Sequence, residues 1–191
     1  MRLLAAILAA ALLASCGPPG PTFKNSDITG AEWGRELSLT DHTGKPRTLA
    51  DFRGKAVVVF FGYVRCPDVC PTTLAELKSV VDQLGEEGRR VQVLFVTVDP
   101  ERDTRELLAQ YVPVFHPDFL GLYGDAEQTA RAAREFKVFY QKVAGSRPDN
   151  YSVDHTAGCY VFDTSGRIRL FVSHGQARTL AADIRTLLKG G

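Results

Sequence analysis

The stretch AVVVFFGYVRCPDVCPTTLAELKSVVDQL, Ala56 to Leu84, decides the fold of this 191-residue chain. It opens with a continuous apolar run, Ala56 to Phe61, which is typical of a strand buried on both faces. From Pro71 to about Leu84, apolar residues recur at three- and four-residue spacing, which predicts a helix. Cys66 and Cys70 lie between the two elements. Such a pair suits a structural disulfide, a redox-active dithiol or a soft-metal site.

Strand and helix patterns alternate on both sides of this stretch. Glu36 to Thr40 alternates and precedes the turn residues Asp41-His42-Thr43-Gly44, which predicts an opening hairpin. A Gly/Pro/Asp/Asn-rich insertion runs on to Asn150. The other expected strands are Val91 to Val98, Val138 to Val143, Thr156 to Asp163 and Ile168 to Val172, and the other expected helices are Thr104 to Tyr111, Asp125 to Phe136 and Gln176 to Leu188. This order predicts a three-layer α/β sandwich. The cysteine pair would then lie at the carboxyl end of a buried strand, where open α/β sheets bind ligands.

The first 34 residues have the pattern of an export signal and a spacer. MRLLAAILAAALLASC carries one positive charge, Arg2, followed by an apolar run too short for a membrane span, which needs about 20 residues. Its end resembles a bacterial lipobox, which implies a lipoprotein signal peptide over residues 1–15 and a lipid on Cys16. Residues 16–34 are rich in Gly, Pro and polar residues and predict a flexible, lipid-anchored linker. We therefore expect a domain over residues 35–191, exported and held at the periplasmic or extracytoplasmic face of a membrane.

Composition and cysteine count narrow the class of protein. The chain is 45% hydrophobic and 24% charged, as in a globular domain, and its formal net charge of +1 comes without a basic block. Nothing in this charge pattern predicts a nucleic-acid partner. Besides Cys16 the chain has Cys66, Cys70 and Cys159, so any pairing leaves one thiol over. A domain of this size needs no disulfide to be stable, so a purely structural disulfide is a poor explanation for Cys66 and Cys70.

The position of the pair favours thiolates. Cys70 adjoins a helix N-terminus and Arg65 adds a nearby cation, and both lower thiol pKa values. Two thiolates suit Cu(I), and an imidazole would complete a three-coordinate site. Three of the four histidines fit an exposed surface, namely His42, His116 and His174. The fourth, His155, comes just before a predicted strand, and from the residues alone it could be a ligand or a surface histidine.

Three segments resemble the Sco/SenC family of copper-binding proteins, which take part in cytochrome c oxidase assembly. They are FFGYVRCPDVCPTTLAEL, VTVDPERDTRELLAQYV and YSVDHTAGCYVFDTSGRIR. Together with GRELSLTDHTGKPRTLADFRGK, the resemblance covers most of Glu32 to Leu188. It implies a thioredoxin-like fold with an extra hairpin insertion. It also implies that Cys66, Cys70 and His155 bind copper, as Cu(I), Cu(II) or both.

The chain departs from the family pattern at two places. Val64-Arg65 replaces the Thr-His that often precedes the first cysteine, so any role of a preceding histidine is absent. Cys159 stands where an apolar residue is expected, and along one regular strand it would face the same side as His155. It could be a fourth sulfur near the site, but we expect a small buried residue. Asp99 and the Asp-Thr pair of DPERDT are expected to cap and turn the chain.

Two functions follow from the resemblance. The first is a metallochaperone that delivers copper to the copper-site subunit of cytochrome c oxidase, with an upstream copper donor protein as a second candidate partner. The alternative is a thiol–disulfide oxidoreductase that uses Cys66 and Cys70 to keep the cysteines of that subunit reduced. The usual redox motif is CxxC, so the longer CxxxC spacing argues mildly against it. A metal site requires His155, whereas dithiol exchange does not.

Overall fold

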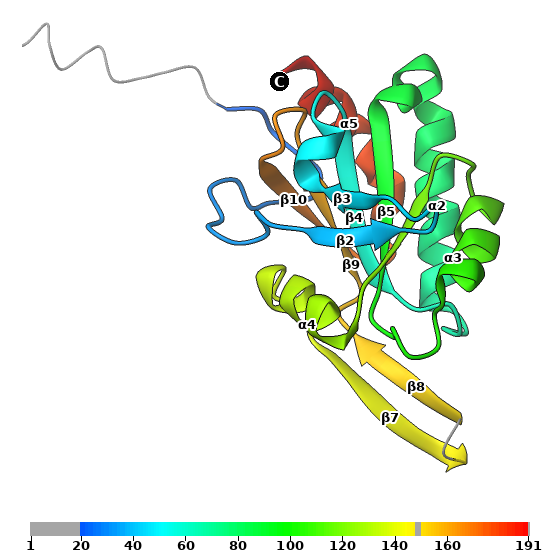
Figure 1. Ribbon diagram of the computed structural model, residues 1–191. Coiled ribbons are helices and arrows are strands. Elements are labelled where there is room, and N and C mark those ends of the chain that lie inside the picture. Colours follow the sequence, from blue (N-terminus) through cyan, green and yellow to red (C-terminus); the bar gives the residue numbers. More distant parts are fainter. Residues whose placement is uncertain (1–19, 148–149, 191) are drawn as a thin grey trace, which may run out of the picture.

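Two apolar segments of the domain form the centre of the sheet. The structure, a computed structural model, describes residues 20–147 and 150–190. In it β4 (Ala56–Gly62) and β5 (Val91–Thr97) pair in parallel, and every residue of both is buried. They belong to an eight-stranded mixed sheet in the order β1-β10-β9-β4-β5-β6-β2-β3 (Figure 1). The other strands of this sheet are β1 (Ser26–Asp27), β2 (Ser38–Asp41), β3 (Pro46–Thr48), β6 (Leu120–Tyr123), β9 (Gly158–Phe162) and β10 (Ile168–Ser173).

Helices cover both faces of this sheet, as a three-layer sandwich requires. They are α2 (Val69–Leu84), α3 (Arg105–Tyr111), α4 (Ala126–Glu135) and α5 (Leu180–Lys189), with short 3-10 turns at Leu49–Phe52, Gly85–Arg90, Val112–Val114 and Ala177–Thr179. Neighbouring residues of a strand point to opposite faces. Phe61 packs on Phe136 at the end of α4, whereas Gly62 faces Cys70 in α2. The predicted sandwich with its opening hairpin is confirmed, and its fold is thioredoxin-like.

The insertion is a two-stranded hairpin, which the sequence pattern only partly revealed. β7 (Tyr140–Arg147) and β8 (Asn150–His155) pair with each other and form a separate sheet. The hairpin projects from the body of the molecule (Figure 1, yellow). The hairpin insertion that the family resemblance implied is confirmed. Its first strand extends beyond the predicted Val143 to Arg147, and the strand predicted from Thr156 begins only at Gly158. A half-exposed hairpin carries little apolar alternation, since it buries only a few side chains.

Part of the predicted spacer belongs to the fold. Ser26–Asp27 pairs with β10, and the Asn25 side chain donates to the buried Asp183 carboxylate at 2.7 Å. Trp33 packs edge-on against the Tyr160 ring, 5.8 Å between centroids. The boundary predicted at residue 35 is thus too late, because hydrogen bonds to distant residues order a segment of low apolar content. The predicted signal peptide and Cys16 lie outside the described residues.

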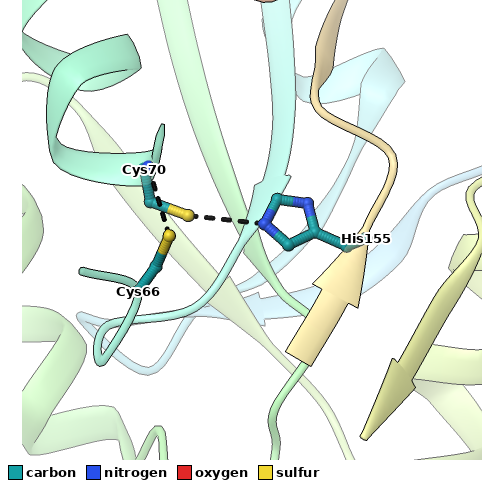
Figure 2. Close-up of side chains that lie close together, drawn as sticks. All are labelled: Cys66, Cys70 and His155. Carbon is teal, nitrogen blue, oxygen red and sulfur yellow. Dashed lines mark hydrogen bonds between the residues drawn. The ribbon is translucent and has the colours of Figure 1, made fainter. Parts of the chain in front are cut away.

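The topology gathers three loops at one end of the sheet. β4 and β5 are parallel neighbours, so the loops after them emerge side by side. The first leads into α2 and carries the cysteine pair, and the second leads into α3. β8 ends at the same place with His155 (Figures 1 and 2). Within the described residues, no helix has the length and apolar character of a membrane span.

Candidate metal centre

The cysteine pair occupies the loop and first turn between β4 and α2. Asp68 is the N-cap of α2, so Cys70 is the second residue of the helix and Pro71 the third. Backbone N–H groups in this first turn have no acceptor within the helix, so a proline costs no hydrogen bond here. The helix thus begins two residues before the predicted start. The Cys70 backbone N–H donates to Cys66 Sγ at 3.4 Å (Figure 2). The start of the helix therefore holds both sulfurs together, as their spacing predicted.

Gly62 has no side chain, and this leaves space for the sulfur of Cys70. A Cβ at this last residue of β4 would lie 2.9 Å from Cys70 Sγ and 2.8 Å from the Phe95 ring, closer than real Cβ contacts. Cys70 is completely buried, while Cys66 is partly exposed. One cysteine is therefore fixed in the protein interior, and the other is partly accessible to solvent.

His155 completes the cluster from the far side. Its Nε2 lies 3.5 Å from Cys70 Sγ, and its Nδ1 lies 3.1 Å from the backbone oxygen of Thr156 (Figure 2). A carbonyl only accepts hydrogen bonds, so Nδ1 carries a proton. Nε2 points at the sulfurs: with a proton it donates to them, and without one it can ligate a metal ion. The rings of Tyr63 and Phe60 pack edge-on against the imidazole, with centroids 6.0 and 6.3 Å away.

These three side chains fit a soft metal ion. Their ligand atoms all lie within 4.8 Å of one another, and no other such group of three occurs in the described part of the chain. Thiolates and a neutral imidazole select ions such as Cu(I), whereas hard cations prefer oxygen ligands. The donor set therefore matches the predicted copper site residue by residue.

The two thiols divide into a thiolate and its hydrogen-bond donor. The Cys66 sulfur accepts a hydrogen bond from the Cys70 S–H, which is the largest cause of its lowered pKa. Further hydrogen bonds from the backbone N–H groups of Cys70 and Asp68 and from the His155 ring add to this effect. Together they outweigh burial, which raises the pKa, and bring the pKa of Cys66 to about 5. The pKa of Cys70 is raised by the same hydrogen bond and by burial. Arg65 is exposed and is not one of these donors, so the structure provides no contact for its predicted influence.

Cys159 lies outside the cluster. It sits in β9, paired with Phe60 of β4, is 2% exposed, and burial raises its pKa to about 12. The prediction of a buried residue is confirmed. The assumption that it shares one strand face with His155 is wrong, because the chain leaves β8 at His155 and starts β9, in the other sheet, at Gly158.

The remaining polar candidates have other roles. His42 Nδ1 accepts from the Gly121 N–H, His116 stacks on Phe119, and His174 is exposed, so none of them joins the cluster. The imidazole of His155 is oriented by the backbone carbonyl of Thr156, and the neighbouring Asp154 is exposed. The packing of Tyr63 on His155 was not predicted, since a lone tyrosine after a strand carries no recognisable signal.

Fold and cluster together define the class, a thioredoxin-like protein in which two thiols and an imidazole converge as ligands for a soft metal. The sequence matches the SCO1/SenC family over residues 25–189, and the chain belongs to that family. The match starts inside the predicted spacer, as the position of β1 also indicates.

Relatives are found in mitochondria and bacteria. The chain is 42% identical over 150 residues to the mitochondrial SCO2 homologue of Bos taurus, covering 78% of this chain and 56% of that protein. It spans about half the length of the mammalian relatives it matches. Apo Sco1 of Thermus thermophilus is 42% identical, with a TM-score of 0.78 and coverage of 87% and 97% of the two chains. Copper-bound ScoI of Bradyrhizobium japonicum is 37% identical, with a TM-score of 0.72 and coverage of 82% and 99%.

Proposed function

We propose that this protein binds copper through Cys66, Cys70 and His155 and delivers it to the copper-site subunit of cytochrome c oxidase during assembly of that enzyme. The convergence of the three ligand atoms within 4.8 Å carries the proposal. Membership of a family with copper-bound structures supports it. The copper is cargo here, so the site has to take it up and also give it up.

The cluster has the properties that such a carrier needs. The lowered pKa makes Cys66 a thiolate at neutral pH, so of the two thiols only Cys70 has a proton to lose on binding. Partial exposure of Cys66 lets an incoming protein ligand approach the ion from one side. Oxidation of the pair to a disulfide would remove both thiolate ligands. Copper would therefore be held by the reduced protein and lost on oxidation.

The test is copper stoichiometry on the reduced protein under a competing Cu(I) chelator. Wild type should retain one copper at the cluster, and His155→Ala and Cys66→Ala should lose it. Cys159→Ala is the matched control, because it removes a thiol outside the cluster and should leave the stoichiometry unchanged. Equal retention by wild type and His155→Ala would contradict the three-ligand site.

One observation favours the second function, thiol–disulfide exchange. Cys66 is a partly exposed thiolate beside a buried thiol, the arrangement of an attacking and a resolving cysteine. Its sulfur would attack a disulfide of the oxidase subunit and form a mixed disulfide with one of the subunit's cysteines. Cys70 would then attack the Cys66 sulfur and release that cysteine as a thiol. One disulfide of the subunit is thus reduced, and one disulfide forms between Cys66 and Cys70. Persistence of this activity in His155→Ala together with failed copper retention in wild type would favour the reductase.

We also propose that the chain is exported and that Cys16 carries a lipid. The lipobox-like sequence before Cys16 and the apolar run that precedes it support this. Mass spectrometry of the mature protein should find an N-terminal, lipid-modified Cys16 in the membrane fraction. Cys16→Ala should abolish the modification and release the protein from that fraction. An unmodified Cys16 in the mature protein would refute the anchor.

A further inference from the structure

His155 is the last residue of β8, a strand that does not belong to the main sheet. Its strand β8 pairs only with β7, and these two strands form their own sheet. The cysteines, by contrast, are fixed by β4 and α2. Ladder hydrogen bonds therefore do not set the distance between the imidazole and the sulfurs. Besides the chain connection to β9 at Gly158 and the hydrogen bond from the His174 N–H to the Ala157 carbonyl, side-chain contacts between the hairpin and the body set it.

Two residues of the loop between β5 and α3 supply these contacts. Asp99, whose side chain is fully buried, accepts a hydrogen bond from the Tyr151 hydroxyl at 2.7 Å. Arg102 Nη1 donates to the backbone oxygen of Tyr151 at 2.8 Å, and its guanidinium lies 3.5 Å from the centre of the Tyr151 ring. Arg102 also pairs with Asp99. The three side chains form a closed cluster, hereafter the hairpin clamp.

The clamp is close to His155 in structure as well as along the strand. Tyr151, Val153 and His155 share one face of β8, because side chains alternate along a strand. Val153 is buried on this face. The Arg102 guanidinium also lies 5.8 Å from the ring of Tyr63, the same ring that packs edge-on against His155. A shift of Tyr151 relative to the body therefore moves the imidazole.

The same loop also holds the cysteine side. Asp103 Oδ2 accepts from the backbone N–H of Val64 at 3.0 Å and from the Thr97 hydroxyl at 2.6 Å. Val64 lies two residues before Cys66. One short loop thus contacts both halves of the metal centre, the hairpin through Asp99 and Arg102 and the cysteine loop through Asp103.

We propose that Arg102 and Tyr151, joined through Asp99, are positioning residues that hold His155 over the cysteine pair. They act on the metal centre only through the histidine. The peripheral ion pair between Lys142 and Glu101, 2.5 Å, is exposed and contributes little, as surface pairs do. The clamp sets the geometry instead, because breaking it deprives the fully buried Asp99 carboxylate of a partner.

The first test compares Arg102→Lys with Arg169→Lys. Lysine keeps the charge but cannot reproduce the planar fork of arginine. Arg169 is a matched control, since it is also mostly buried, pairs with Asp163 and lies 5.5 Å from the ring of Phe23. Cu(I) affinity should fall by about 10- to 100-fold in Arg102→Lys, the usual effect of losing support behind a ligand. It should not change in Arg169→Lys, and equal losses in both would overturn the proposal.

The second test asks whether the effect passes through His155. In a His155→Ala background, Arg102→Lys should cause no further loss of Cu(I) affinity, because the group it positions is absent. An undiminished loss in that background would overturn the proposal. Tyr151→Phe removes only the hydroxyl and keeps the ring, so it gives the same comparison with less risk to folding.

These affinities rest on the proposed function, whereas a metal-free measurement does not. In the reduced protein without copper, nuclear Overhauser contacts between the rings of His155 and Tyr63 should be present in wild type and weaken in Arg102→Lys and Tyr151→Phe. Unchanged contacts would refute the positioning role whatever the protein binds. Weakened contacts in a protein that binds no copper would refute the proposed function and leave the clamp standing.

Discussion

The sharpest prediction concerns the pH at which Cys66 becomes reactive. Its pKa is lowered to about 5 from an ordinary 9.0, first because the Cys70 S–H donates to its sulfur. At pH 7 Cys66 is then about 99% thiolate, against about 1% for an ordinary thiol. The intrinsic nucleophilicity of a thiolate falls with its pKa, by roughly 40- to 100-fold over four units. The two effects nearly cancel, so the rate at pH 7 is no test.

The shape of the pH profile is the test. Alkylation of an ordinary thiol rises about tenfold per pH unit up to its pKa. Alkylation of Cys66 should rise only up to a midpoint near pH 5 and then stay flat to pH 9. The reduced protein is treated with iodoacetamide at each pH, and peptide mass spectrometry with fragmentation separates Cys66 from Cys70 and Cys159. A midpoint near pH 9 would refute the thiolate.

Three variants identify the cause of the shift. Cys70→Ala removes the largest contribution and should move the midpoint upward the most. His155→Ala removes a smaller contribution and should move it less. Arg65→Ala should leave the profile unchanged, because Arg65 is exposed and is not among the donors to the sulfur. A large shift in Arg65→Ala alone would restore the interpretation from sequence and discard the hydrogen-bond explanation.

Three further predictions concern stability. Burial raises the pKa of Asp41, but hydrogen bonds from neighbouring donors lower it from 3.8 to about 2. The ionised carboxylate therefore contributes on the order of 2 kcal/mol to the free energy of unfolding. This contribution is complete above pH 4 and is lost as the pH falls through 2. Urea unfolding should show the difference between wild type and Asp41→Asn shrinking over that range, and a constant difference would contradict it. Gly62→Ala should lower the free energy of unfolding by about 1–3 kcal/mol and weaken Cu(I) retention, because the new Cβ would crowd Cys70 Sγ. Unchanged unfolding and unchanged retention would show that the surrounding side chains can move to make room for the Cβ. Asp183→Ala should speed hydrogen exchange of the backbone N–H of Asn25, which donates to that carboxylate at 3.0 Å, and exchange as slow as in wild type would show that β1 alone holds the segment.

The sequence by itself determined the centre of the fold and two of the three residues of the metal centre. Continuous apolar runs and helical periodicity are local signals, and β4, β5 and α2 follow them within two residues. The spacing of Cys66 and Cys70 at a helix start brings both sulfurs together for the same local reason. The family resemblance then pointed to His155, which the residues alone left open.

Only the tertiary structure decided the rest. His155 reaches Cys70 from 85 residues away, and it does so on a hairpin whose weak apolar pattern hides one of its strands. The N-terminal segment looks like a spacer until Asp183 is seen to bind it. The contacts of Arg102 with Tyr151 join the loop after β5 to a strand of the separate hairpin sheet, which no local pattern predicts. Periodicity records which face of an element is buried, but not which distant element covers it.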